Sequence, residues 1–188
     1  IKAMMDRIIH RGPNSSGQYV DDSVALGFRR LSIIDIEAGN QPMYSPDGNV
    51  VLIFNGEIYN FLGLKEKLEE KGHTFLTHSD TEVLLHAYLE YGEKVVDHLR
   101  GMFGFAVWDK REKKLFIARD HFGIKPVYYG KFGDTFMFAS EIKAFLDNEK
   151  FVKELNKEAL KPYLTFQYSV LNETFFKGVF KLDPGHTL

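Results

Sequence analysis

The sequence contains no cysteine among its 188 residues. Disulfide bonds, thiolate metal sites and thiol nucleophiles are therefore excluded for the residues present. Its apolar runs are strand-sized, far short of the roughly 20 residues that a membrane-spanning helix needs. No apolar segment of a signal peptide is visible, so we expect a cytoplasmic protein that does not associate with a membrane. Lysines and arginines are scattered and the formal net charge is −2, which predicts no nucleic-acid partner.

Hydrophobic residues make up 44% of the chain, with 17 Phe and 9 Tyr. This is enough apolar surface for one domain with a sizeable core. The seven histidines show no metal-ligand spacing, and no glycine-rich phosphate loop is present. We therefore expect no metal and no cofactor in this domain.

Hydrophobic periodicity predicts three principal helices and several short strands. The helices are expected over residues 2–9, 61–71 and 79–91, and the strands over 18–20, 24–34, 50–54, 103–108, 115–119, 127–129 and 135–139. We expect the last four strands to form one antiparallel meander, and the chain from residue 168 onward to be irregular. Residues 50–54 and 103–108 are apolar on both alternations, so both faces must be covered. The prediction is an α+β fold, a four-layer α/β/β/α sandwich of two antiparallel sheets.

The stretch Asn55-Gly56-Glu57 directly follows a buried strand. We expect the strand to end there, because Asn-Gly favours a tight turn. An Asn amide beside a Gly N–H can stabilise an oxyanion. The Glu57 carboxylate either holds a substrate ammonium or is a solvated turn residue.

Arg30 shares the alternation of Val24, Leu26 and Phe28, which predicts that its guanidinium is buried. A buried guanidinium needs an anionic partner. Two interpretations are open: an internal salt bridge, or a bidentate contact with a substrate carboxylate.

The stretch Ser79-Asp80-Thr81-Glu82 has two interpretations as well. Ser79 and Glu82 fit a capping box, in which Asp80 complements the helix dipole. Alternatively, Asp80 faces a cleft and binds an ammonium group. Taken as a set, one Arg, two acids and an Asn-Gly pair suit a small zwitterion with a reactive carbonyl.

Eight motifs in this order resemble a known family. They are His10-Arg11-Gly12-Pro13, Arg30-Leu31-Ser32-Ile33-Ile34-Asp35, Gly39-Asn40-Gln41-Pro42-Met43, Asn55-Gly56-Glu57-Ile58-Tyr59-Asn60, Ser79-Asp80-Thr81-Glu82, residues 101–106, residues 119–129, and Ser140-Glu141-Ile142-Lys143-Ala144. The chain resembles, over nearly its whole length, the glutaminase domain of glutamine-hydrolysing asparagine synthetases. These are class II glutamine amidotransferases of the N-terminal-nucleophile hydrolase type. One departure is Asn14, where the family usually has Asp.

The resemblance implies the sandwich fold and a set of site residues for L-glutamine. Arg30 would bind the α-carboxylate, main-chain groups of Leu31, Ser32, Ile33 and Ile34 would line the pocket, Asn55 and Gly56 would form the oxyanion hole, and Glu57 and Asp80 would hold the α-ammonium. The family's nucleophile is an N-terminal Cys on a first strand, which is not among these residues. The chain alone is therefore expected to be inactive.

The same resemblance implies what surrounds the domain. Residues 1–188 would be the glutaminase domain without its first strand, and a synthetase domain using ATP and magnesium would follow residue 188. Ammonia would pass to that domain for the amidation of aspartate, and a homodimer is a further expectation. The alternative is a scaffold domain that lost its Cys and hydrolyses nothing, as in relatives similar to β-lactam synthetases.

Overall fold

The computed structural model describes residues 1–31 and 39–188. Its α-helices are α1 (Lys2–Arg7), α2 (Phe61–Glu70), α3 (Asp80–Tyr91) and α4 (Leu160–Phe166), and its 3₁₀ helices are η1 (Ile9–Arg11), η2 (Gly92–His98), η3 (Ile142–Phe145) and η4 (Lys157–Ala159). The strands are β1 (Ser15–Val20), β2 (Ala25–Arg30), β3 (Met43–Tyr44), β4 (Val50–Ile58), β5 (Gly101–Asp109), β6 (Lys114–Arg119), β7 (Tyr128–Phe132), β8 (Thr135–Ala139) and β9 (Val179–Lys181). The three predicted helices are confirmed within a few residues. No helix in this part of the chain is long and apolar enough to cross a bilayer.

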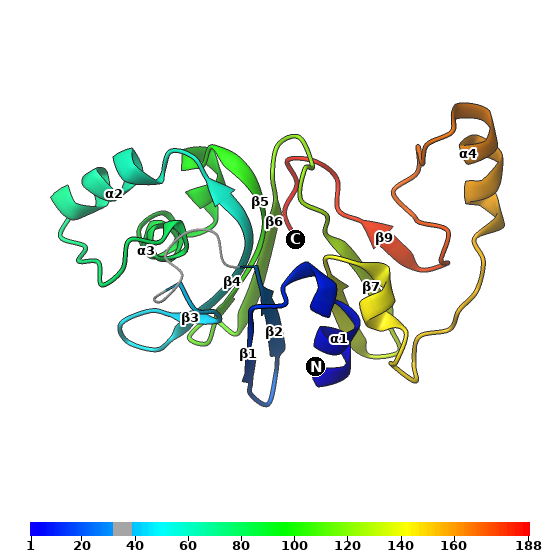
Figure 1. Ribbon diagram of the computed structural model, residues 1–188, viewed down its shortest axis with the longest axis horizontal. Helices are drawn as coiled ribbons and strands as arrows, with labels where there is room; N and C mark the ends of the chain where they lie inside the picture. The colour runs from blue at the N-terminus through cyan, green and yellow to red at the C-terminus, as the bar shows by residue number, and fades with distance from the viewer. Residues whose placement is uncertain (32–38) are drawn as a thin grey trace.

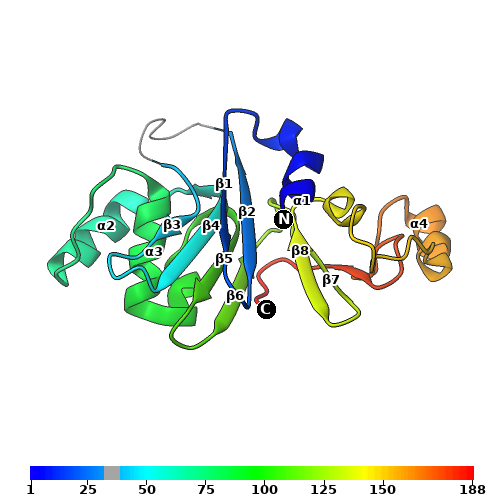
Figure 2. The ribbon, with the colours of Figure 1, turned by 90° about the horizontal axis from the view of Figure 1, so that it is seen from below.

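The strands form antiparallel sheets stacked in layers. Over the described ranges the sheet orders are β1-β2, β3-β4-β5-β6 and β8-β7-β9. Helices α2 and α3 cover one face of the four-stranded sheet, and the two smaller sheets lie on the other side of it (Figures 1 and 2). The layered α/β sandwich is thus confirmed, with three sheets where we expected two.

Both faces of the central sheet are buried, as the double apolar alternation predicted. Phe54, Phe103 and Phe105 join the core cluster that includes α2 and α3. On the opposite face, Val51 and Trp108 pack with Leu26 of β2. Burying each large apolar side chain contributes roughly 1.5–3 kcal/mol, so the central sheet is the stable scaffold for whatever lies at its edges.

The expected meander is wrong, because β6 and β7 belong to different sheets. The turn between them is fixed by two buried side chains. Asp120 accepts hydrogen bonds from the backbone N–H groups of residues 103, 122, 124 and 125. The Arg119 guanidinium donates to the carbonyls of Lys125, Gly123 and Leu182. These bonds direct the chain from one sheet to the other, and hydrophobic periodicity in the sequence does not reveal such a turn.

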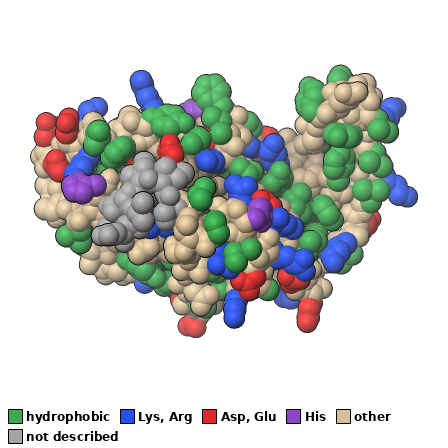
Figure 3. Space-filling view, viewed as in Figure 1, with side chains coloured by type: hydrophobic (Ala, Val, Ile, Leu, Met, Phe, Trp, Pro, Cys, Tyr) green, Lys and Arg blue, Asp and Glu red, His purple; other side chains and the backbone are tan. Residues whose placement is uncertain are grey.

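The C-terminal segment is less irregular than expected. Strand β9 pairs with β7, with Phe180 opposite Tyr129. Helix α4 stands apart from the body at the far end of the molecule (Figure 1). None of its residues is buried, and hydrophobic side chains lie on its surface, beside a notch that separates α4 from the body (Figure 3).

We expect Asp21→Ala to destabilise the β1–β2 hairpin. The Asp21 carboxylate accepts hydrogen bonds from the Tyr19 hydroxyl at 2.6 Å and the Trp108 Nε1–H at 2.8 Å. Losing about 1 kcal/mol would lower the Tm by about 2–4 °C in a domain of this size. Asp22→Ala, one residue along the same turn, is the matched control and should leave the Tm nearly unchanged.

The same variant has a pH signature. The Tyr19 hydrogen bond, helped by the N–H groups of Ser23 and Val24, lowers the pKa of Asp21 to about 2 from 3.8. Because the pKa of Asp21 is lower in the folded state than in the unfolded state, the ionised carboxylate stabilises the fold above about pH 4. This stabilisation is lost as the pH falls toward 2. Thermal melts should therefore show the gap between wild type and Asp21→Ala closing between pH 4 and 2. A constant gap would mean that the carboxylate charge is irrelevant.

Candidate functional site

A cavity of about 170 Å³ lies where β2, β4 and α3 meet. Its wall contains six of the nine residues singled out from the sequence: Arg30, Leu31, Asn55, Gly56, Glu57 and Asp80. The other three, Ser32, Ile33 and Ile34, lie outside the described residues. These six residues come from segments up to 50 residues apart in the chain and bring one guanidinium, two carboxylates and two donor groups to the same small space.

The expected tight turn at Asn55-Gly56 is wrong, because β4 continues through both residues to Ile58. Asn55 lies opposite Gly104 and Gly56 opposite Phe103 of β5. The continuous partner strand overrides the local turn preference. Glycine is needed at 56 because a Cβ there would lie 2.0 Å from the Met102 carbonyl oxygen.

The Asn55 side chain carries an unused donor. Its Nδ2 is buried and has no hydrogen-bond partner among residues 1–31 and 39–188. Leaving a buried amide donor unsatisfied costs about 1–3 kcal/mol. A ligand oxygen in the cavity would recover that free energy, so Asn55 is built to receive an acceptor.

Arg30 is buried as its alternation predicted, with 6% of its surface exposed. It ends β2, and its Nη1 donates to Asn40 Oδ1 at 3.3 Å. The His10–Pro13 segment packs closely behind it: a Cβ on Gly12 would lie 2.5 Å from the Arg30 nitrogen, and Pro13 forms a β-bridge with Arg30. This close packing fixes the direction in which the guanidinium leaves the strand.

The acidic side of the cavity is set by the start of α3. Asp80 Oδ2 accepts the Ile58 N–H at 3.0 Å. Burial raises the pKa of the Asp80 carboxyl, and the nearby Glu57 raises it further, while the Ile58 bond opposes the rise. A cation bound between Glu57 and Asp80 would relieve both effects by favouring the carboxylates.

The capping box is only half formed. Ser79 caps α3 by accepting the Glu82 N–H at 3.2 Å. The Glu82 carboxylate does not return to Ser79 but accepts the N–H groups of Leu76 and Thr77. Helix α3 is therefore tied to the loop before it, and this holds Asp80 against β4.

Sequence reasoning gave no site role to the other residues that line the cavity: Arg11, Phe28, Arg29, Gly39, Gln41, Phe54, Thr81 and Lys125. Gln41 and Thr81 belong to motifs of the resemblance but carried no chemical signal of their own. Lys125 reaches the cavity only because Asp120 and Arg119 fold the turn after β6. Its position depends on tertiary contacts that no local pattern reveals.

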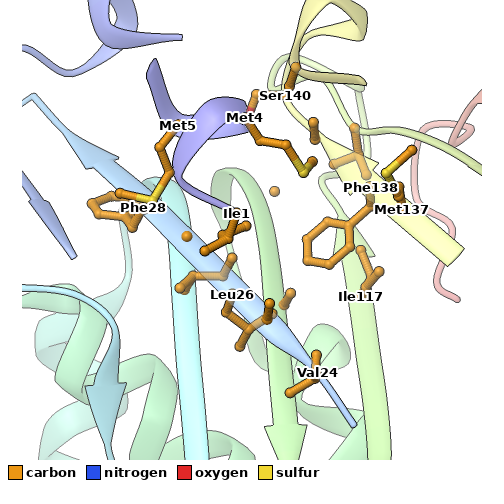
Figure 4. Close-up of a pocket in the computed structure, with 18 of the residues that line it drawn as sticks. Ile1, Met4, Met5, Val24, Leu26, Phe28, Ile117, Met137, Phe138 and Ser140 are labelled. Carbon is orange, nitrogen blue, oxygen red and sulfur yellow. The ribbon is translucent and has the colours of Figure 1, made fainter. Parts of the chain in front are cut away.

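A larger groove of about 640 Å³ adjoins the small cavity, since Asn55 and Phe54 line both. Its walls are mostly apolar and include Leu26 and Phe28 of β2 and Met137 and Phe138 of β8 (Figure 4). Within the described ranges, β2 pairs only with β1 and β8 only with β7, and the outer strands β1 and β7 lie on the far sides (Figure 2). Apart from the single Pro13–Arg30 bridge, the facing edges of β2 and β8 thus pair with no strand of the described residues, and they flank an apolar groove that Asn55 also lines.

The arrangement suits acyl chemistry on a small zwitterion. Guanidinium and carboxylates can bind the two charged ends, and the Asn55-Gly56 donors can hold a carbonyl oxygen. In the part of the chain that the structure describes, no group of three or more His, Cys, Asp or Glu side chains could hold a metal ion.

Comparison with known proteins extends these observations. A family model described as a glutamine amidotransferase domain matches residues 1–188. Asparagine synthetase [glutamine-hydrolyzing] 1 of Bacillus subtilis (strain 168) is 49% identical over 98% of this chain and 29% of the relative. An asparagine synthetase [glutamine-hydrolyzing] of Zea mays is 48% identical over 78% of this chain and 25% of the relative. The chain thus spans less than a third of the length of these curated relatives.

Solved structures support the fold. Glutamine phosphoribosylpyrophosphate amidotransferase from B. subtilis superposes with a TM-score of 0.64, at 24% identity, over 76% of this chain and 39% of that chain. A second structure, described as the allosteric regulatory enzyme of purine biosynthesis, gives a TM-score of 0.54 at 30% identity, over 64% of this chain and 28% of that chain. The first likeness, at this identity, concerns the fold alone.

Proposed function

Because the chain belongs to the glutamine amidotransferase domain family, we propose that it is the glutaminase domain of an asparagine synthetase. The observation that carries the proposal is the buried Nδ2 of Asn55 beside Gly56, which has no hydrogen-bond partner among the residues that the structure describes. These donors lie in one cavity with a guanidinium and two carboxylates. That set matches the two charged ends and the carboxamide of L-glutamine.

Each end of glutamine has a complementary partner in this proposal. Arg30 binds the α-carboxylate through its planar fork, and Glu57 and Asp80 hold the α-ammonium. The carboxamide oxygen lies between Asn55 Nδ2 and the Gly56 N–H. Leu31 lines the same cavity, and the family resemblance would give main-chain groups of residues 32–34 a role in binding glutamine as well.

The nucleophile would come from a strand connected to Ile1. Ile1 itself lines the groove between β2 and β8 (Figure 4). A strand placed there would pair with both free edges and join the two small sheets. Its Cys would then lie near Asn55, where the groove meets the small cavity.

The reaction has two steps in this proposal. The Cys thiolate attacks the carboxamide carbon, and the oxygen gains negative charge between the Asn55 and Gly56 donors. The Cys α-amine, which accepted the thiol proton, passes it as an ammonium to the amide nitrogen, and the C–N bond breaks to release ammonia and leave a thioester. Water then hydrolyses the thioester to glutamate and frees the thiol.

The remainder of the protein would use the ammonia. Relatives about three times as long support a synthetase domain after residue 188, where ATP and magnesium would activate aspartate for amidation. These cofactors would act in that domain. We further propose a cytoplasmic location and a possible homodimer.

Ammonia release tests the proposal directly. A preparation of residues 1–188 should release no ammonia from glutamine above buffer, since no side chain in it can replace the thiol. The protein purified from its natural source should begin at Cys, by intact mass and N-terminal sequencing, and should hydrolyse glutamine. A start at any other residue, without hydrolysis, would favour the Cys-less scaffold instead.

A further inference from the structure

The Gln41 side chain forms two hydrogen bonds with the backbone of Phe54, the residue before Asn55. Its Oε1 accepts the Phe54 N–H at 2.6 Å, and its Nε2 donates to the Phe54 carbonyl at 3.0 Å. A side-chain amide has the same donor and acceptor groups as a peptide unit. Gln41 therefore pairs with β4 as another strand would.

Strand register explains why a side chain takes this place. Met43 lies opposite Leu52 and Tyr44 opposite Val51, so the same register places Gln41 opposite Phe54. The backbone leaves the ladder here: Pro42 has no N–H, and the Gln41 carbonyl is held against Gly17, where a Cβ would lie 2.0 Å from its oxygen. The side-chain amide supplies the pairing that the backbone cannot.

Alternation along β4 gives this pairing a consequence for the cavity. In an antiparallel strand, every second residue directs its N–H and C=O to the same edge. The N–H of Phe54 is bound by Gln41, and the N–H of Ile58 is bound by Asp80 at 3.0 Å. Gly56 lies midway between them, so its N–H points to this edge as well. Gln41 and Asp80 thus fix the strand on both sides of the Gly56 donor.

We propose that Gln41 is a positioning residue for the oxyanion hole. The inference rests on the proposed function. By holding the Phe54 peptide, Gln41 sets the position of the Gly56 N–H and of the Asn55 side chain relative to the reacting carbonyl. Its Nε2 also lies 3.5 Å from Thr81 Oγ1, which ties the same point of β4 to the first turn of α3.

The test uses the full-length protein with its nucleophile, comparing Gln41→Met with wild type. Methionine has a similar size but lacks both hydrogen-bonding groups. We expect kcat for glutamine hydrolysis to fall about 10- to 100-fold, because a small displacement of catalytic groups has effects of that order. The KM for glutamine should change less than threefold. Gln18→Met, an exposed glutamine on β1, is the matched control and should behave as wild type.

Two further measurements separate positioning from a merely structural role. The γ-aldehyde analogue of glutamate forms a tetrahedral adduct with a thiol, so its oxygen occupies the oxyanion hole, whereas glutamate binding does not need those donors. Gln41→Met should weaken aldehyde binding at least 10-fold and leave glutamate binding within threefold. The Phe54 amide should also exchange with solvent faster in this variant than in wild type. Gln41→Glu, which keeps the acceptor but loses the donor, should give smaller changes in the same directions.

Equal weakening of aldehyde and glutamate binding, or an unchanged kcat in a folded variant, would overturn the inference. The proposed function is tested separately on the wild type. If the wild-type protein neither hydrolyses glutamine nor binds the aldehyde, the proposed function itself is wrong. If Gln41→Met does not fold, Gln41→Glu is the test variant, and a greater loss of aldehyde affinity than of glutamate affinity is again the expected result.

Discussion

In the full-length protein, Asn55→Ala is expected to lower kcat for glutamine hydrolysis by about 10²–10³-fold, the usual effect of losing one oxyanion donor. The reason lies in the buried Nδ2 of Asn55, which has no partner within residues 1–31 and 39–188 and would gain one when an acceptor enters the cavity. Its hydrogen bond should strengthen as the carbonyl oxygen gains charge. The effect on KM should therefore be much smaller than the effect on kcat. Steady-state kinetics of glutamate formation provide the measurement.

An exposed asparagine gives the matched control. Asn172→Ala removes an amide on the surface and should leave both constants unchanged. If Asn55→Ala raised KM and left kcat unchanged, Asn55 would bind the ground state of the substrate and would not stabilise the oxyanion. Thermal melts of both variants confirm that the comparison is made on folded protein.

Arg30→Lys is the second change with a large expected effect. Lysine keeps the positive charge but loses the planar fork that matches a carboxylate. We expect kcat/KM for glutamine to fall about 10- to 100-fold, the value of a strong charge-assisted pair. A glutamine analogue without the α-carboxylate should be nearly unaffected, because it never uses the fork.

Nitrogen supply separates the two interpretations of Arg30. If Arg30 binds glutamine, asparagine formation from ammonium salt should persist in Arg30→Lys while formation from glutamine falls. Equal losses with both nitrogen sources would show that Arg30 maintains the fold or a domain interface. Arg111→Lys, in the turn after β5 and outside both cavities, is a suitable control, since its Nη2 also pairs with a carboxylate, that of Asp109, at 2.7 Å.

The fold could be predicted from sequence wherever burial left a periodic pattern. The double apolar alternation of residues 50–54 revealed a central strand covered on both faces, and the alternation of Arg30 revealed its burial. The Asn55-Gly56 turn was mispredicted because the turn preference of two residues is weaker than a nine-residue ladder to β5. Strand β9 was missed because three residues are too short to show a period.

The residues of the candidate site could likewise be predicted only in part. Groups with strong chemistry at the end of a strand or helix, such as Glu57 and Asp80, could be singled out from sequence and lie around one cavity. Gln41 and Lys125 could not, because each depends on contacts with a distant segment. Their chemistry is that of any surface amide or amine until the tertiary fold places them.

The position of Asn55 and Gly56 within the longest pairing of the central sheet also affects how the site responds to denaturation. Loop-borne catalytic groups can be lost in local openings that leave the rest of the fold intact. Here the two donors separate from their neighbours only when β4 leaves β5, which would expose the main core. In increasing urea, the active fraction should thus follow the folded fraction, and partial disorder elsewhere, for instance in the protruding α4, would leave the donors in place.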